Sequence, residues 1–166
     1  TMIQRITFGC PLPTESVVLP VEPAAAAVPH LTAEPDGSWS FSLAEDAVVY
    51  GLGEMPRGIN KRGWHYVTDN TDESHHGENR LSYYGAHNFL LIDGGAGRSV
   101  FGVFVDFPGK VFYDIGYTRH DRLAFRTEEP DYDLLLVWGD SPNAVCTEFR
   151  KLIGHSYIPP KWAFGF

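Results

Sequence analysis

Glycine and proline interrupt this chain so often that long helices have little room to form. The 166 residues include 17 Gly and 12 Pro, and the runs between them are short and rich in aromatic or β-branched side chains. Proline ends helices and glycine favours turns, whereas short runs of this kind are typical of strands. Strands and helices do not alternate along the chain, so a parallel sheet is not expected. The pattern predicts an all-β domain, mainly an antiparallel β-sandwich.

The clearest strand pattern follows Asp36-Gly37, which is a hairpin-type turn. Trp39, Phe41 and Leu43 alternate with serines there, so one face of this strand should be buried. Comparable runs predict further strands at 5–8, 17–19, 48–52, 64–67, 89–92, 100–107, 111–115, 123–127 and 132–137. The short turns between the later runs favour antiparallel neighbours.

One helix is predicted near the end of the chain. Ser141 can cap it, Pro142 suits its first position and Gly154 should end it. Its apolar side chains recur on one face, which should pack on a sheet: Val145, Phe149, Leu152 and Ile153. Beyond it, Trp162, Phe164 and Phe166 occupy alternate positions, which predicts a strand. Since an unpaired aromatic edge invites aggregation, we expect the chain to be part of a longer protein.

The charge balance argues against several classes of partner. Lys and Arg number 13 against 21 Asp and Glu, which gives a formal net charge of −8. Nucleic acids and anionic membrane surfaces are bound by clustered Lys and Arg, and the sequence has no such run. No apolar stretch approaches the ~20 residues that span a bilayer. We therefore expect neither nucleic acid nor membrane as a partner.

The two cysteines indicate whether the protein resides in a reducing or an oxidising cellular compartment. Cys10 and Cys146 lie far apart and share no ligand-type spacing with a His or another Cys. We expect both to be buried thiols that pack as small apolar side chains. The chain also shows no leader with a basic start and an apolar core, so no secretory signal is predicted. Together these features indicate a reducing, cytoplasmic location.

A polar and irregular stretch covers residues 54–88. It is dense in Gly, Asn, Asp, His and Arg, and only 64–67 could form a strand within it. An irregular segment of this length inside a domain is usually a functional loop or a disordered one. Its Trp and Tyr residues and its mixed charges argue against plain disorder. We therefore expect a functional loop.

Five blocks in a fixed order resemble a known family. They are Tyr-Gly-Leu-Gly-Glu at 50–54, Arg-Gly-Ile-Asn-Lys-Arg at 57–62, Tyr-Gly-Ala-His-Asn-Phe at 84–89, Asp-Ile-Gly-Tyr at 114–117 and the run 153–166. Together they resemble the N-terminal β-sandwich domain of glycoside hydrolase family 31, the α-glucosidases and α-xylosidases, and most closely the bacterial α-glucosidases. The resemblance implies a galactose-mutarotase-like sandwich over 1–158, with 159–166 leading into a (β/α)8 catalytic barrel.

The family hydrolyses α-glycosidic bonds with retention, using two aspartates of the barrel. The resemblance therefore implies no catalytic residue, no cofactor and no metal in this chain, which should be inactive alone. The implied partners are its own barrel and an α-linked gluco-oligosaccharide. The loop 54–88 would reach over the barrel mouth and form part of the substrate pocket.

Within that loop, the polar tip 68–73 is the candidate substrate site. Carboxylates accept hydrogen bonds from vicinal sugar hydroxyls, and a flanking Thr both donates and accepts. The resemblance places Asp72 beside the sugar next to the cleaved bond, and we add Thr71 and Asp69 as substrate-binding candidates. Alternatively, Asp69 or Asp72 forms an Asx-turn with nearby backbone. A catalytic pair of these two is disfavoured, because a mobile loop would not hold their separation.

Other side chains of the loop receive structural interpretations. Adjacent His75 and His76 point opposite ways on an extended segment and suit one metal ion poorly, even with Glu78. His87 should bond the loop base to the sheet. The basic residues Arg57, Lys61, Arg62 and Arg80 should pair with the acids of the loop. Trp64 and Tyr66 could stack on a sugar, although core packing is favoured.

Two other functions stay open from the sequence. A free-standing carbohydrate-binding module would display exposed aromatic side chains and lose sugar affinity without Trp64 or Tyr66. An aldose mutarotase would share the sandwich, but its chain is longer and its His and Glu side chains converge in the concave face of the sheet.

Overall fold

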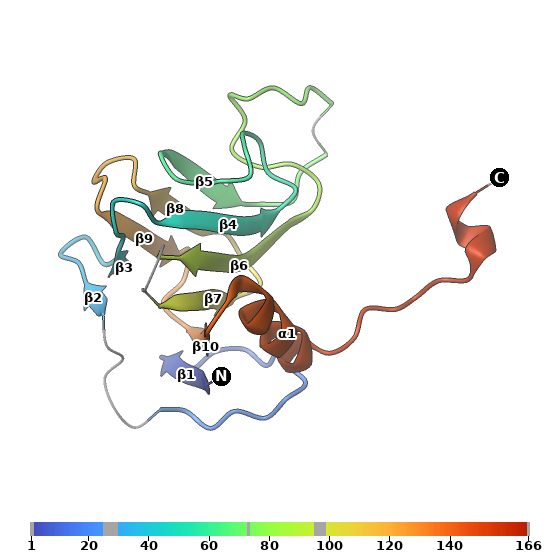
Figure 1. Cartoon of the computed structure of the whole chain (residues 1–166), viewed down its shortest axis with the longest axis horizontal. Coiled ribbons are helices and arrows are strands. Elements are labelled where there is room, and N and C mark those ends of the chain that lie inside the picture. Colours follow the sequence, from blue (N-terminus) through green and yellow to red (C-terminus); the bar gives the residue numbers. More distant parts are fainter. Residues whose placement is uncertain (1, 25–29, 73, 95–98, 166) are drawn as a thin grey trace.

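Two antiparallel sheets of five strands each face one another in the computed structural model (Figure 1). The structure describes residues 2–24, 30–72, 74–94 and 99–165. The first sheet has the order β1 (Met2–Phe8), β10 (Tyr132–Gly139), β7 (Val100–Asp106), β6 (Ala86–Asp93) and β4 (Val48–Gly53). The second has the order β2 (Leu31–Ala33), β3 (Trp39–Ser42), β9 (Arg122–Thr127), β8 (Val111–Ile115) and β5 (Trp64–Thr68). The predicted all-β sandwich is confirmed.

The core lies between the two sheets, and the predicted alternation holds only in part, because Ser38 and Ser40 are buried as well and Trp39 is half-buried. Phe41 and Leu43 are buried, as expected for alternate positions of a half-buried strand. They join apolar side chains from both sheets in one cluster, which includes Leu90, Val103, Val105, Ile115, Leu123, Phe125, Leu134 and Leu136. This shared core holds the two layers together.

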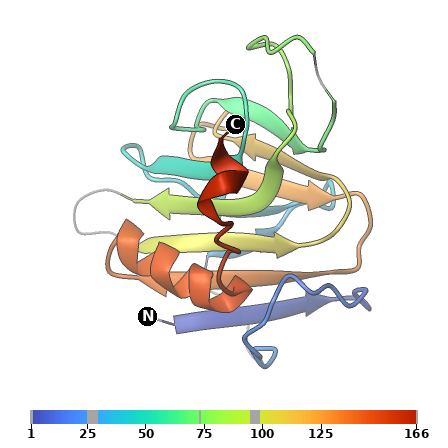
Figure 2. The ribbon, with the colours of Figure 1, turned by 90° about the vertical axis from the view of Figure 1, so that its right-hand side faces the viewer.

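The helix α1 (Pro142–Ile153) covers the outer face of the first sheet (Figure 2). As predicted, the Ser141 hydroxyl caps it by accepting from the Ala144 amide at 3.2 Å. Gly154 ends it with φ 84°, a conformation that glycine adopts at little cost. Val145 and Leu152 are fully buried, whereas Ile153 is 39% exposed, because it lies at the helix end where a cleft begins. The central strands β7 and β10 are thus buried on both faces.

Some predicted elements are wrong. Residues 17–19 are not a strand, because Val18 and Leu19 donate their amides to Leu152 O at the end of α1, at 2.9 and 3.2 Å. The short strand β2 was not predicted. The expected strand at the chain end is instead a 3₁₀ helix, η1 (Lys161–Phe164), which points away from the sandwich (Figure 1). Phe166 lies outside the described residues.

The cysteines also differ from expectation. Cys10 and Cys146 are both free and exposed rather than buried. Cys146 lies next to the buried Val145 on α1 but on the side turned from the sheet, and Cys10 follows the end of β1. Separately, none of the helices in the described part of the chain is long and apolar enough to cross a membrane.

Candidate functional site

The loop that carries the predicted site joins two different sheets. It leaves β5 in the second sheet at Thr68 and enters β6 in the first sheet at Ala86. The Thr68 hydroxyl donates to Asn88 Oδ1 at 2.5 Å and accepts from the Val111 amide at 3.3 Å. Asn88 in turn donates from Nδ2 to Phe107 O at 3.1 Å. Side chains therefore tie the base of the loop to both layers.

Further hydrogen bonds join the two arms of the loop closer to its tip. Asn70 Oδ1 accepts from the Ala86 amide at 2.6 Å. One residue further, the Thr71 amide donates to Tyr83 O at 3.1 Å. The outgoing and returning arms of the loop therefore lie side by side up to Thr71.

Asp69 lies at the loop base and has a partner. Its Oδ2 forms an ion pair with Lys110 Nζ at 3.1 Å, and its amide donates to the Ser82 hydroxyl at 3.3 Å. The hydrogen bond with Asp69 raises the pKa of Lys110. Lys110 belongs to the turn between β7 and β8, so this pair connects the loop to a second turn.

Asp72 is exposed and lies just beyond the last of these contacts. No hydrogen bond or ion pair joins its carboxylate to any residue that the structure describes, so the Asx-turn alternative does not hold for Asp72. Thr71 beside it is exposed as well. Glu73, the last residue of the predicted tip, lies outside the described residues.

The rest of the loop packs on itself. Tyr83 is buried, and its hydroxyl donates to Gly77 O at 3.0 Å. The ring of His76 lies 5.0 Å from that of Tyr83 and 5.3 Å from that of Tyr84. Within the described residues, no group of three or more His, Cys, Asp or Glu could hold a metal ion. His76 thus contacts two tyrosine rings, of which only Tyr83 is buried.

The predicted ion pairs of the basic residues are wrong for three of them. Arg57 donates to His65 O at 3.2 Å, and its guanidinium carbon lies 4.4 Å from the centre of the Trp64 ring. Lys61 is buried. Arg62 donates to the carbonyl oxygens of Ala44, Glu45, Ala47 and His120. Backbone carbonyls and aromatic rings thus take the place of the expected carboxylates.

The two aromatic candidates in β5 differ in exposure. Tyr66 is 1% exposed and belongs to the core, so it is not available to stack on a sugar. Trp64 is 44% exposed, and the guanidinium of Arg57 lies over one face of its ring. Of the two candidates, Trp64 alone presents exposed ring surface, and the predicted core packing is confirmed for Tyr66 and wrong for Trp64.

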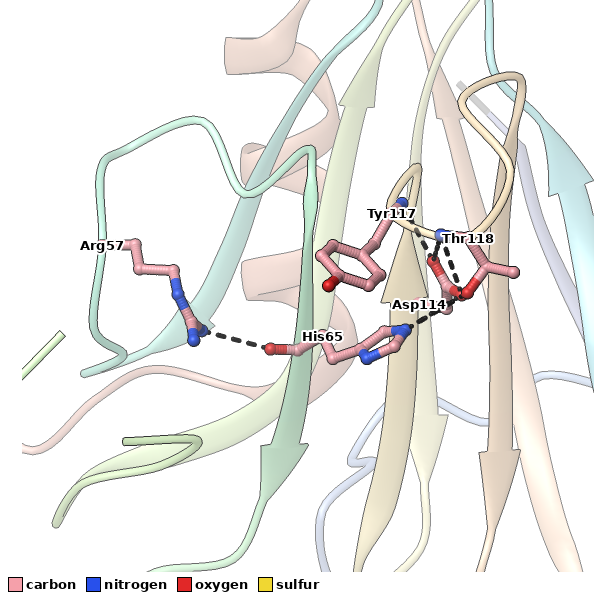
Figure 3. A network of polar contacts seen from close by, with 5 residues as sticks. All are labelled: Arg57, His65, Asp114, Tyr117 and Thr118. Carbon is pink, nitrogen blue, oxygen red and sulfur yellow. Dashed lines mark hydrogen bonds and ion pairs between the residues drawn. The ribbon is translucent and has the colours of Figure 1, made fainter. Parts of the chain in front are cut away.

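A polar network at the edge of the second sheet escaped the sequence analysis (Figure 3). His65 Nε2 lies 3.1 Å from Asp114 Oδ2, and Asp114 Oδ1 accepts from the amides of Tyr117 and Thr118 at 3.0 and 3.1 Å. Burial alone would raise the pKa of Asp114, but hydrogen bonds from Thr118, His65 and Tyr117 outweigh it and lower that pKa. Asp114 and Tyr117 belong to one of the five blocks that carry the resemblance, but the sequence did not indicate their contact with His65. The network fixes the turn between β8 and β9.

A cleft of about 1140 Å³ opens beside the loop base. Its lining includes Asp69, Asn70, His87, Lys110 and Ile153. The predicted hydrogen bond from His87 to the sheet is absent among the described residues, and its desolvation at the cleft lowers the pKa of His87. Since Ile153 ends α1, the loop base and the outgoing chain border the same cleft.

Sequence comparison assigns the chain to a family. Residues 22–114 match the profile of the glycosyl hydrolase 31 N-terminal galactose mutarotase-like domain. The chain belongs to this family. The matched range runs from the segment after β1 to Asp114 in β8, and it contains the whole loop described above.

Relatives of this glycosyl hydrolase 31 domain are much longer proteins. The α-xylosidase XylQ of Lactiplantibacillus pentosus is 32% identical over 125 residues, which are 75% of this chain and 15% of that protein. Alpha-glucosidase 2 of Bacillus thermoamyloliquefaciens is 31% identical over 129 residues, 76% of this chain and 16% of that protein. A Flavobacterium johnsoniae GH31 dextranase complexed with isomaltotriose shares the fold, with a TM-score of 0.69 and 24% identity over 85% of this chain and 17% of its own. The chain spans less than a fifth of each relative.

Proposed function

We propose that this domain is the accessory N-terminal domain of a retaining α-glucosidase that acts on short α-linked gluco-oligosaccharides. The observation that carries the proposal is the match of residues 22–114 to the glycosyl hydrolase 31 N-terminal domain, together with relatives named α-glucosidase and α-xylosidase. Retaining hydrolysis needs two carboxyl groups about 5–5.5 Å apart across the scissile bond. In this proposal a catalytic barrel supplies them, and the domain alone does not hydrolyse glycosides.

The loop between β5 and β6 would contribute substrate contacts. Asp72 supports this role best, because its carboxylate is exposed and unpaired among the described residues. A carboxylate of this kind accepts hydrogen bonds from neighbouring sugar hydroxyls, and the exposed Thr71 beside it can donate as well as accept. Asp69 has one oxygen on Lys110, so only its other oxygen would remain for the sugar.

The chain leaves α1 at Ile153, which borders the same cleft as the base of the loop. This side of the molecule suits contact with a catalytic domain. The chain that leaves α1 exposes large apolar side chains, which are Tyr157, Ile158, Trp162 and Phe164. Exposed apolar groups gathered on one segment mark surfaces that other protein covers. We assign this segment to packing against the barrel. The free, exposed thiols of Cys10 and Cys146 support a reducing compartment, and we place the protein in the cytoplasm.

The test is steady-state kinetics on the full-length protein that contains this domain. We expect Asp72→Ala to raise KM for a disaccharide about 10-fold or more, because a hydrogen bond to a charged group contributes about 1.5–3 kcal/mol. Asp140→Asn removes an exposed carboxylate next to α1 and serves as the matched control. Equal kinetics for the two variants would refute the loop contact.

A second measurement tests the assignment of catalysis. The 166-residue chain, incubated with an aryl α-glucoside, should release no product above the rate in buffer. Turnover by the chain alone would overturn the accessory role.

A further inference from the structure

The loop between β5 and β6 bridges two sheets that no backbone ladder joins at this edge. Within the described part of the chain, β5 pairs only with β8, whereas β6 pairs with β4 and β7. In Figures 1 and 2 the two arms of the loop rise together from these strands at one edge of the sandwich. Because strand pairing does not hold the arms together, other contacts must do so.

Backbone hydrogen bonds from the Val67 amide to Leu81 O at 3.4 Å and from the Thr71 amide to Tyr83 O at 3.1 Å provide part of this contact. The side chains of Asn70 and Asn88 add two further links. Asn88 accepts from the Thr68 hydroxyl at 2.5 Å, so it joins β6 to the end of β5. Asn70 accepts from the Ala86 amide at 2.6 Å, two residues further along both arms. The two contacts form successive rungs between the arms.

The outer rung lies close to the proposed substrate contact. Asp72 follows Asn70 by two residues, so their Cα atoms are at most about 7 Å apart. Between them, the Thr71 amide donates to Tyr83 O at 3.1 Å. Asp72 is therefore the first residue beyond the hydrogen bonds that join the two arms of the loop. Its range of positions depends on where Asn70 is held.

We infer that Asn70 is a positioning residue, which holds the arms of the loop together and thereby sets where the Asp72 carboxylate can reach. This inference rests on the proposed function, in which Asp72 contacts the sugar. A residue fixed before binding need not be ordered during binding, which lowers the cost of association. Loss of the Asn70 contact should therefore weaken substrate binding without any direct contact between Asn70 and the sugar.

Two substitutions of Asn70 distinguish a positioning role from a general effect on folding. Asn70→Ala removes the acceptor, whereas Asn70→Asp keeps an oxygen at the same place and should restore the contact. Asn70 is exposed, so neither change opens a cavity in the core. Asn143→Ala, at an exposed site in the first turn of α1, is the matched control.

The first readout is amide hydrogen exchange of the chain itself. In Asn70→Ala the amides of Thr71 and Ala86 should exchange about 2- to 10-fold faster, the change expected for the loss of one hydrogen bond. Asn70→Asp and Asn143→Ala should match the unaltered chain. Unchanged exchange in Asn70→Ala, or equally fast exchange in Asn70→Asp, would overturn the inference.

The second readout is kinetics of the full-length protein. Asn70→Ala should raise KM about 2- to 10-fold with little change in kcat, and Asn70→Asp should restore KM. If Asp72→Ala raises KM and Asn70→Ala does not, the positioning role fails while the proposed function stands. If neither variant changes KM although exchange is faster in Asn70→Ala, the proposed substrate contact fails, and with it the functional part of the inference.

Discussion

Lys61 is a buried cation with little to balance it. Its residue is 6% exposed, its ammonium lies 3.5 Å from Pro56 O and 5.6 Å from the centre of the Tyr66 ring. No carboxylate of the described residues forms an ion pair with it. Burial lowers the pKa of Lys61, and the charge of Glu78 opposes this only in part. A buried charge without a close partner opposes folding.

Replacement of Lys61 by an apolar side chain of similar length should therefore stabilise the protein. We expect Lys61→Met to raise the free energy of unfolding by about 1 kcal/mol, because similar replacements of buried charges are often neutral or stabilising. Urea denaturation measures the change. The control is Lys151→Met, which removes an exposed cation paired with Glu148 and should change stability by less than about 0.5 kcal/mol. A loss of stability in Lys61→Met would show that its weak contacts balance the charge.

Partners of single residues were the least predictable part of the site. The sequence indicated that Asp72 was a candidate, but not that its carboxylate would be free while Asp69 pairs with Lys110. The partner of Asn70 depends on how the two arms of the loop align, and that alignment depends on the packing of the sheets. Local patterns do not contain this information.

At the scale of elements, α1 approaches the first sheet closely because β7 contains a glycine. A Cβ atom at Gly102 would lie 2.7 Å from a ring carbon of Phe89 and 3.0 Å from Val145 Cγ1. Both neighbours are buried and cannot move away freely. The glycine therefore leaves the space into which the helix packs.

Filling that space should destabilise the protein. We expect Gly102→Ala to lower the free energy of unfolding by about 1–3 kcal/mol, the usual cost of an added group in a packed core. Thermal unfolding measures it as a lower Tm. Gly58→Ala is the control, since its Cβ would meet nothing within 4 Å, and its Tm should stay the same or rise slightly. An unchanged Tm for Gly102→Ala would mean that the helix can shift without cost.

A predicted helix or strand was confirmed more readily where the residues that specify it lie within the element itself. The predicted limits of α1 are confirmed, because Ser141, Pro142 and Gly154 act within the helix itself. Strands need a neighbour, which can come from anywhere in the chain. The apolar run 17–19 contacts the end of α1 instead of a sheet, and no strand of the described residues pairs with η1. Both runs have the composition of strands, but neither has a neighbouring strand to pair with among the described residues.

At the scale of the molecule, the sandwich buries tyrosines of both sheets. Tyr113 in β8 is buried, and its hydroxyl has no hydrogen-bond partner among the residues that the structure describes. Tyr132 in β10 is buried as well. Desolvation raises the pKa of both phenols well above their ordinary value of 10.0. The neutral form of these side chains is therefore a condition of the packed two-layer structure.

Because these phenols are buried, the stability of the whole molecule should decrease at alkaline pH. Above about pH 10 the unfolded chain loses its phenolic protons while the folded chain keeps them, so the free energy of unfolding falls as pH rises. Lys61 acts in the opposite direction below pH 10.5, because its pKa is lower in the folded state. It is one group against three phenols, because burial also raises the pKa of Tyr66. Urea denaturation from pH 8 to 11 should show the decline.

Tyr113→Phe identifies the source of that decline. The variant removes an unpartnered buried hydroxyl, so it should be more stable by about 1 kcal/mol at pH 8 and should lose less stability toward pH 11. Tyr157→Phe alters an exposed phenol and should follow the unaltered protein at every pH. If Tyr113→Phe instead shows the same slope above pH 10, its phenol ionises in the folded state, and the two sheets must separate at this point without global unfolding.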